Sequence, residues 1–129
     1  MRRHRFVPIL GAIVLTLGAT AYGAAPVTIK AYPQVAFAGS GLRVTVRVEK
    51  HEDNRRLALV WEGPTSGSTD RPHVGLDAPL QIVFEKEFPR MEAGVTSLLA
   101  IVQRQSPEGK ITELRSQVIE VTILEGLPQ

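Results

Sequence analysis

The stretch Leu42-Arg-Val-Thr-Val-Arg-Val48 decides the fold of this 129-residue sequence. Apolar residues occupy every second position of 42–48, and Arg43, Thr45 and Arg47 lie between them. Alternation with a period of two is typical of a β-strand that is buried on one side only. The apolar side must pack against another layer, so the rest of the chain should supply a second sheet.

Other segments have the same character. The strand-like runs are 27–31, 57–61, 80–84 (which Phe88 extends), 95–102 and 119–123. Polar or Gly/Pro-containing connections separate them: a turn over 50–56, a loop over 63–73 and a tight hairpin over 106–110. No segment has a helical period over ten residues or more. The pattern therefore predicts an all-β fold, a single antiparallel β-sandwich of about seven strands.

Pairing of these strands gives two sheets. We expect strand 42–49 to pair antiparallel with 80–88, which brings Arg43 and Arg47 near Glu85 and Glu87. The second sheet should contain 57–62, 95–104 and 111–124. Trp61, the one tryptophan, has the parity of Leu57 and Leu59, so we expect it in the core.

Several of these features together resemble bacterial immunoglobulin-like domains. Pro33 and Gly39-Ser-Gly41 lead into the strand 42–48, Trp61 lies on the next strand, Ala93-Gly94-Val95 opens a later one, and Pro107-Glu108-Gly109 precedes the last. The resemblance covers about residues 27–124. The paired cysteines of antibody domains and the corner tyrosine are missing, so the subfamily stays open. The resemblance implies an immunoglobulin-like sandwich and a binding or spacing role.

The N-terminus has the pattern of a secretory signal peptide. Arg2, Arg3 and Arg5 precede an apolar run over 6–17, and small residues fill 18–25. Cleavage after Ala21 or after Gly23 would both fit. We predict a signal peptide over 1–23, a domain over 24–129 and export to the periplasm or the extracellular space. The apolar run is short for a membrane span, so none is expected after cleavage.

Charge and cysteine content exclude some classes of function. The sequence has 15 Lys and Arg residues against 13 Asp and Glu. Without the three arginines of the signal peptide, twelve basic residues face the thirteen acidic ones. No net positive field then remains to attract phosphates, so we expect no nucleic-acid partner. The absence of cysteine excludes disulfides, and stability must come from the core.

Candidate catalytic and metal-binding residues are sparse, and we predict a non-enzymatic protein without cofactor. Ser66, Asp70, His73 and Asp77 crowd one segment and suggest the alternative of a periplasmic hydrolase or metal-binding protein that uses loop 63–79. That alternative requires Asp70, His73, Asp77 and Glu62 to converge. His51 with Glu52 and Asp53 forms a second cluster, in which a calcium ion could find oxygen ligands; exposed turn charge explains it more simply.

The more informative surface is the outer face of the second sheet. Its strands are apolar on both faces, so one set of apolar side chains must point outward. The expected interaction face consists of Val60, Val118 and one parity of strand 95–104: Leu98, Ala100 and Val102, or else Leu99 and Ile101. We favour the first set, with Glu62 and Glu120 at the rim. Such a surface predicts a protein partner or self-association, unless loop 63–79 covers it.

Overall fold

The computed structural model describes residues 25–88 and 90–126. The predicted signal peptide and both cleavage positions therefore lie outside the described residues. Within those ranges all regular elements are strands: β1 (Val27–Tyr32), β2 (Val35–Phe37), β3 (Arg43–Val48), β4 (Asn54–Glu62), β5 (Gly67–Pro72), β6 (Gln81–Phe84), β7 (Gly94–Gln105), β8 (Ile111–Arg115) and β9 (Ile119–Leu124). Within the same residues no helix is long and apolar enough to cross a membrane.

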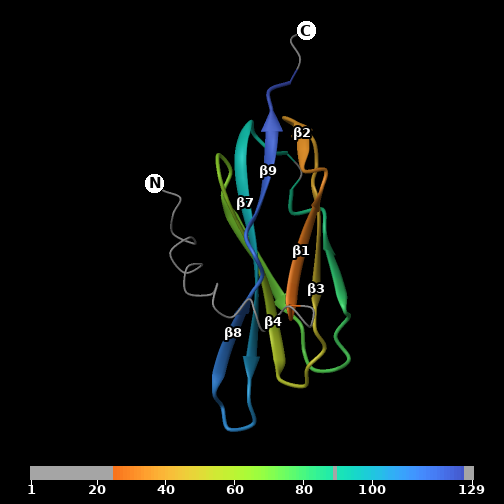
Figure 1. Ribbon diagram of the computed structural model, residues 1–129, viewed down its shortest axis with the longest axis vertical. Helices are drawn as coiled ribbons and strands as arrows, with labels where there is room; N and C mark the ends of the chain where they lie inside the picture. The colour runs from red at the N-terminus through yellow and green to blue at the C-terminus, as the bar shows by residue number, and fades with distance from the viewer. Residues whose placement is uncertain (1–24, 89, 127–129) are drawn as a thin grey trace.

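The strands form two sheets that lie side by side along the long axis of the molecule (Figure 1). One sheet has the order β1-β3-β6, and the other has the order β2-β9-β7-β4-β5, with β8 also paired to β7. The all-β prediction is confirmed. The described chain has nine strands rather than about seven.

The smaller sheet is built on the alternating stretch that decided the fold. β3 pairs antiparallel with β1 and with β6, where Val44 lies opposite Phe84. The expected pair of Arg43 and Glu85 is present, with N–O distances of 2.8 and 2.9 Å. The expected pair of Arg47 and Glu87 is wrong. Arg47 lies opposite Gln81, and Glu87, beyond the end of β6, binds Arg71 instead.

The larger sheet contains the three predicted segments. β7 pairs antiparallel with β4, β8 and β9. The predicted strand over 111–124 is interrupted at Ser116, whose backbone N–H donates to the carbonyl of Ala100 while its Oγ accepts from the N–H of Ala100, both at 2.9 Å. This exchange keeps β8 and β9 on the same neighbour although the strand itself is broken.

Two strands, β2 and β5, lie where the sequence predicted none. β5 occupies most of the expected loop 63–73 and pairs antiparallel with β4, with Gly67 opposite Trp61 and Pro72 opposite Arg56. β5 is thus an edge strand beside β4 and does not fold over the outer face of the sheet. Gly67 fits this position because a Cβ there would stand 2.7 Å from Cζ2 of Trp61.

The core lies between the two sheets. Its buried residues are Val27, Ile29, Leu42, Val44, Val46, Val48, Leu57, Leu59, Trp61, Ile82, Phe84, Phe88, Met91, Leu98, Ala100, Val102, Val121 and Ile123. Trp61 is buried among them, which confirms the prediction for this residue. The guanidinium of Arg71 lies 4.2 Å from the centre of the Phe84 ring. The aliphatic part of this β5 side chain therefore covers the core at the β5 edge of the sandwich.

Candidate functional site

The predicted interaction residues can be compared with the side chains that lie on the outer face of the larger sheet. Leu98, Ala100 and Val102 are fully buried and belong to the core between the sheets. Their register partners are Trp61, Leu59 and Leu57, whose side chains point inward. Because paired residues share a face, these three residues of β7 cannot form part of an exposed surface, and the prediction for them is wrong.

The opposite parity of β7 faces outward, next to Val60. Leu99 lies opposite Val60, and Ile101 lies opposite Ala58. Val60, Ile101 and Val118 are half-buried, and Leu99 is only 3% exposed although it lies outside the core cluster. The centre of the outer face is therefore apolar in the described chain, but it is not a widely exposed patch.

Exposed apolar side chains gather instead at one end of this face, on β2, β9 and the start of β7. Val35 lies opposite Thr122, and Thr122 lies opposite Val95. Phe37 lies opposite Leu124, two residues further on. The exposed fractions are 58% for Val35, 49% for Phe37, 49% for Val95 and 43% for Leu124. We call these four residues the β2–β9 patch.

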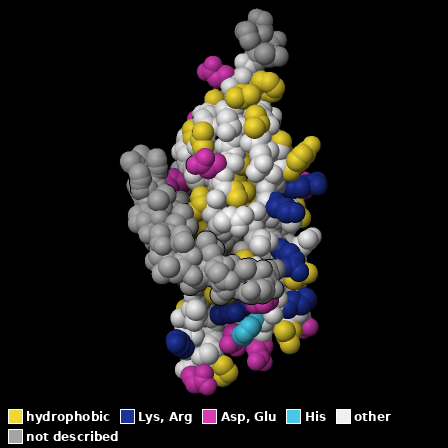
Figure 2. Space-filling model, in the orientation of Figure 1, with side chains coloured by type: hydrophobic (Ala, Val, Ile, Leu, Met, Phe, Trp, Pro, Cys, Tyr) yellow, Lys and Arg dark blue, Asp and Glu magenta, His cyan; other side chains and the backbone are white. Residues whose placement is uncertain are grey.

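The register puts the four side chains of the β2–β9 patch on the same side of the sheet. Ile123 and Ala36, which alternate with them, pack on the core. Figure 2 shows hydrophobic side chains on the upper part of the molecule, where β2 and β9 lie, and most of the charged side chains on the lower half and one flank. Sequence reasoning missed this patch because it left 33–39 without a strand.

Carboxylates border the β2–β9 patch. Glu120 lies two residues before Thr122 on the same face of β9. It lies opposite Ser97 of β7, which in turn lies opposite Glu62 of β4. Glu125 follows Leu124, and Glu92 follows Met91, whose carbonyl accepts from Gly39 at 2.9 Å. The segments 33–41, 90–97 and 119–126 together hold three glutamates and one arginine, Arg90. The end of the domain that carries the patch is thus acidic.

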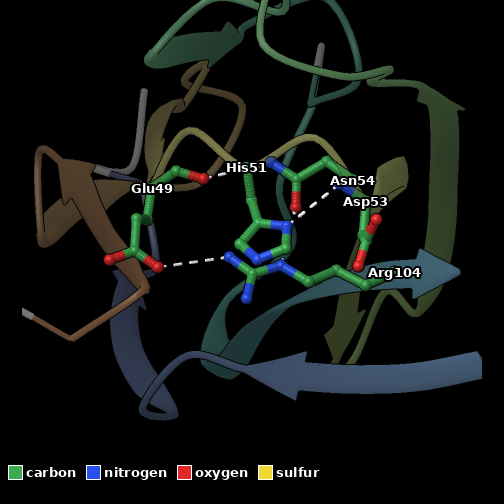
Figure 3. Close-up of polar contacts among 5 residues, drawn as sticks. All are labelled: Glu49, His51, Asp53, Asn54 and Arg104. Atoms are coloured by element: carbon green, nitrogen blue, oxygen red, sulfur yellow. Dashed lines mark hydrogen bonds and ion pairs between the residues drawn. The ribbon is translucent and has the colours of Figure 1, made fainter. Parts of the chain in front are cut away.

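A polar cluster lies at the other end, in the turn between β3 and β4 (Figure 3). Asn54 is fully buried; its Nδ2 donates to the carbonyl of Glu49 at 3.0 Å, and its Oδ1 accepts from Nε of Arg104 at 2.9 Å. Arg104 also binds Glu49 at 3.2 Å. Nδ1 of His51 accepts from the backbone N–H of Asp53 at 3.0 Å. These contacts hold the turn in one conformation, and Nδ1 of His51 is already engaged by the backbone of the turn.

The residues that suggested a hydrolase or metal site in 63–79 do not converge. Ser66 precedes β5 and bonds Gly63 at 3.2 Å, whereas His73 follows β5. Seven residues of extended chain separate them by roughly 20 Å. Asp70 forms an ion pair with Arg56 at 2.8 Å. Over residues 25–88 and 90–126, no group of three His, Asp or Glu side chains is placed to hold a metal ion.

His73 is buried for a structural reason. Its backbone N–H donates to the carbonyl of Arg55 at 2.9 Å, which continues the pairing of β4 and β5. Burial lowers the pKa of its imidazole, and the nearby Lys50 ammonium adds to this effect. Lys50 is itself held by the carbonyls of Leu76 and Ala78, both at 3.1 Å. The neutral imidazole thus belongs to the packing of this end of the sandwich.

A shallow hollow of about 450 Å³ lies on the smaller sheet, lined by Tyr32, Gly41, Leu42, Arg43 and Glu85. Tyr32 lies opposite Arg43 in the pairing of β1 and β3 and is highly exposed. The charge of Arg43 is already matched by Glu85. The hollow therefore offers an aromatic ring but no uncompensated charge.

Comparison with known proteins adds no assignment. No protein-family model matches the chain, and no curated protein is significantly similar to it.

Proposed function

We propose that this chain is an exported, non-enzymatic binding or assembly module with an immunoglobulin-like sandwich, and that the β2–β9 patch makes its contact with a protein. The signal-peptide pattern of 1–23 supports export. The strand orders β1-β3-β6 and β2-β9-β7-β4-β5 support a two-sheet sandwich of the immunoglobulin-like kind. The chain passes from β1 in the smaller sheet to the short strand β2, which lies beside the last strand, β9, in the larger sheet.

The observation that carries the proposal is the exposure of four apolar side chains on one end of one face. Val35, Phe37, Val95 and Leu124 are each between 43% and 58% exposed. A cluster of this kind with a polar border marks an interaction site more often than scattered apolar residues do. Covering it removes apolar area from water at about 25 cal/mol per Å², which favours association.

The test is site-specific photo-cross-linking in cells that export the protein. A photoreactive phenylalanine analogue replaces Phe37 in one variant and Val83 in another. Val83 is a matched control because it is 47% exposed and lies on β6, in the other sheet. The proposal expects a discrete cross-linked product, with a partner or a second copy, from position 37 and none from position 83. No product at 37, or the same products at both positions, would contradict it.

A further inference from the structure

β2 is the last strand on its side of the larger sheet, and its outer edge has no neighbour among the described strands. The carbonyl of Gln34 accepts from Thr122 at 2.9 Å, and the N–H of Ala38 donates to Leu124 at 2.7 Å. Along a strand in a parallel pair, alternate residues direct their backbone groups to the same neighbour. Gln34, Ala36 and Ala38 therefore face β9, and Val35 and Phe37 direct their backbone groups to the open side.

The open edge has hydrogen-bonding groups to offer. Val35 has both an N–H and a carbonyl on this side. Phe37 has its N–H there, while its carbonyl accepts from Ser40 at 3.1 Å within the following turn. An extended segment lying along β2 would meet these groups in the way that strand-addition sites meet their peptides.

The other edge strands carry the devices that discourage such pairing. β5 has Asp70, Arg71 and Pro72, and β1 has the exposed Lys30. β6 is followed directly by Glu85, Lys86 and Glu87. Charged side chains and proline at sheet edges are known means of preventing unwanted strand addition. β2 consists only of Val, Ala and Phe and is followed by Ala38, Gly39 and Ser40, so among the described edge strands it has no charged residue either within it or directly after it.

We infer that β2 receives an extended peptide as an added strand, and that this peptide has apolar side chains at alternate positions and Lys or Arg at its ends. The inference rests on the proposed function of the β2–β9 patch. One set of alternate side chains of an added strand lies on the outer face, beside Val35 and Phe37. Basic ends complement Glu92, Glu120 and Glu125, which form no ion pair within the described residues.

The same acidic border argues against a second copy as the occupant. Two copies joined through β2 would bring their own glutamates together at one interface, and like charges in close apposition weaken association. A peptide of opposite charge gains from the same border. The partner that fits is therefore a different, basic segment.

The test uses the purified protein and a fluorescent nine-residue peptide, Lys-Lys-Val-Thr-Val-Thr-Val-Lys-Lys, with binding followed by fluorescence anisotropy. Two further peptides have N-methyl groups on the three valines or on the two threonines. Only one set of backbone N–H groups can face β2, so one of these peptides should lose binding by about tenfold or more, and the other should stay within about threefold of the parent. A peptide with Glu in place of every Lys should also bind at least about tenfold more weakly.

Protein variants locate the site. Phe37→Ser should weaken binding of the parent peptide, and Val83→Ser should leave it unchanged, with circular dichroism confirming that both fold. Equal binding of the parent and both N-methylated peptides would overturn strand addition while leaving the patch as a contact surface. Absence of binding by every peptide up to about 1 mM would also overturn the inference. So would self-association that Phe37→Ser abolishes, because the occupant would then be a second copy. The cross-linking at position 37 reports on the proposed function separately.

Discussion

The indole ring of Trp61 lies 4.8 Å from the phenyl ring of Phe88, centre to centre, at an interplanar angle of 59°. Trp61 belongs to β4 of the larger sheet, and Phe88 follows β6 of the smaller one. Tilted aromatic pairs at this distance are favourable beyond the area they bury. The pair therefore joins the two sheets, and Gly67 leaves the space at the edge that the indole needs.

Trp61→Ala should lower the free energy of unfolding by about 3–5 kcal/mol, because it leaves a large cavity between the sheets. Equilibrium denaturation in urea, followed by circular dichroism, measures the loss. Trp61→Phe is the control and should cost less, since it retains a ring opposite Phe88. A loss below about 1 kcal/mol for Trp61→Ala would contradict the central position of the indole.

The network of Asn54, Arg104 and Glu49 gives a second prediction. Asn54→Leu keeps the branched shape and the number of heavy atoms of the side chain but removes the partners of Nε of Arg104 and of the carbonyl of Glu49. Because unpaired polar groups in a buried site are costly, we expect a loss of about 2–3 kcal/mol in the free energy of unfolding. Gln117→Leu replaces an exposed amide outside the network and should change stability by less than about 0.5 kcal/mol. Equal effects of the two variants in urea denaturation would show that the network contributes no stability.

The buried imidazole of His73 predicts a loss of stability in mild acid. Burial, with a smaller effect of Lys50, holds its pKa below the ordinary value of 6.5. Below pH 6.5 the unfolded chain takes up a proton that the folded chain resists, so the free energy of unfolding falls as the pH is lowered. Well above pH 6.5 both states are neutral at this residue, and it causes no pH dependence.

Denaturation at pH 7.5, 6.5 and 5.5 checks this sign. The parent should lose stability between pH 6.5 and 5.5, and His73→Gln should lose less over the same interval. His51→Gln is the matched control, because it removes an imidazole that is only half-buried, and it should behave like the parent. A parent protein as stable at pH 5.5 as at pH 7.5 would contradict the prediction for His73.

The sequence was sufficient for the strands with a one-sided pattern. The alternation in 42–48 predicts β3 and its buried face, because only one register buries the three valines of β3 together with Leu42, which precedes the strand. The hairpin over 106–110 was also predictable: Ser106 and Lys110 are joined by a 2.9 Å backbone hydrogen bond, and Gly109 has a φ of 92°. There, turn chemistry and local backbone geometry agree.

The candidate site was beyond this kind of reasoning. β7 is apolar on both faces, so its sequence pattern does not show which alternate residues face the core. Only the pairing with β4 places Leu98 inward and Leu99 outward. β5 has a loop-like composition, Gly-Ser-Thr-Asp-Arg-Pro, and becomes a strand because β4 offers it an edge. β2 is three residues long, too short for any alternation to be visible. The β2–β9 patch depends on these pairings, which are long-range.

Export predicts a processed N-terminus. The basic and apolar segments of 1–23 should direct secretion, and the mature protein should begin at Tyr22 or Ala24. N-terminal sequencing of the protein from the exported fraction decides between the two positions. Arg2, Arg3 and Arg5 all changed to Asp should retain the precursor inside the cell, because the basic segment is removed. An exported, membrane-bound product that still begins at Met1 would show an uncleaved anchor instead.

The two faces of the larger sheet give the last prediction, through a pair of matched leucine substitutions. Leu98→Glu places a carboxylate without a partner in the core, where Leu98 is fully buried; it should abolish the cooperative unfolding transition. Leu124→Glu places the same group on the β2–β9 patch, where Leu124 is 43% exposed; it should change the free energy of unfolding by no more than about 0.5 kcal/mol. Thermal melts followed by circular dichroism distinguish the two.

Leu124→Glu should nevertheless reduce cross-linking from position 37, because it adds a charge beside Phe37 on the contact surface. A folded Leu98→Glu variant would return Leu98 to the outer face, and undiminished cross-linking in a folded Leu124→Glu variant would separate the contact from the β2–β9 patch.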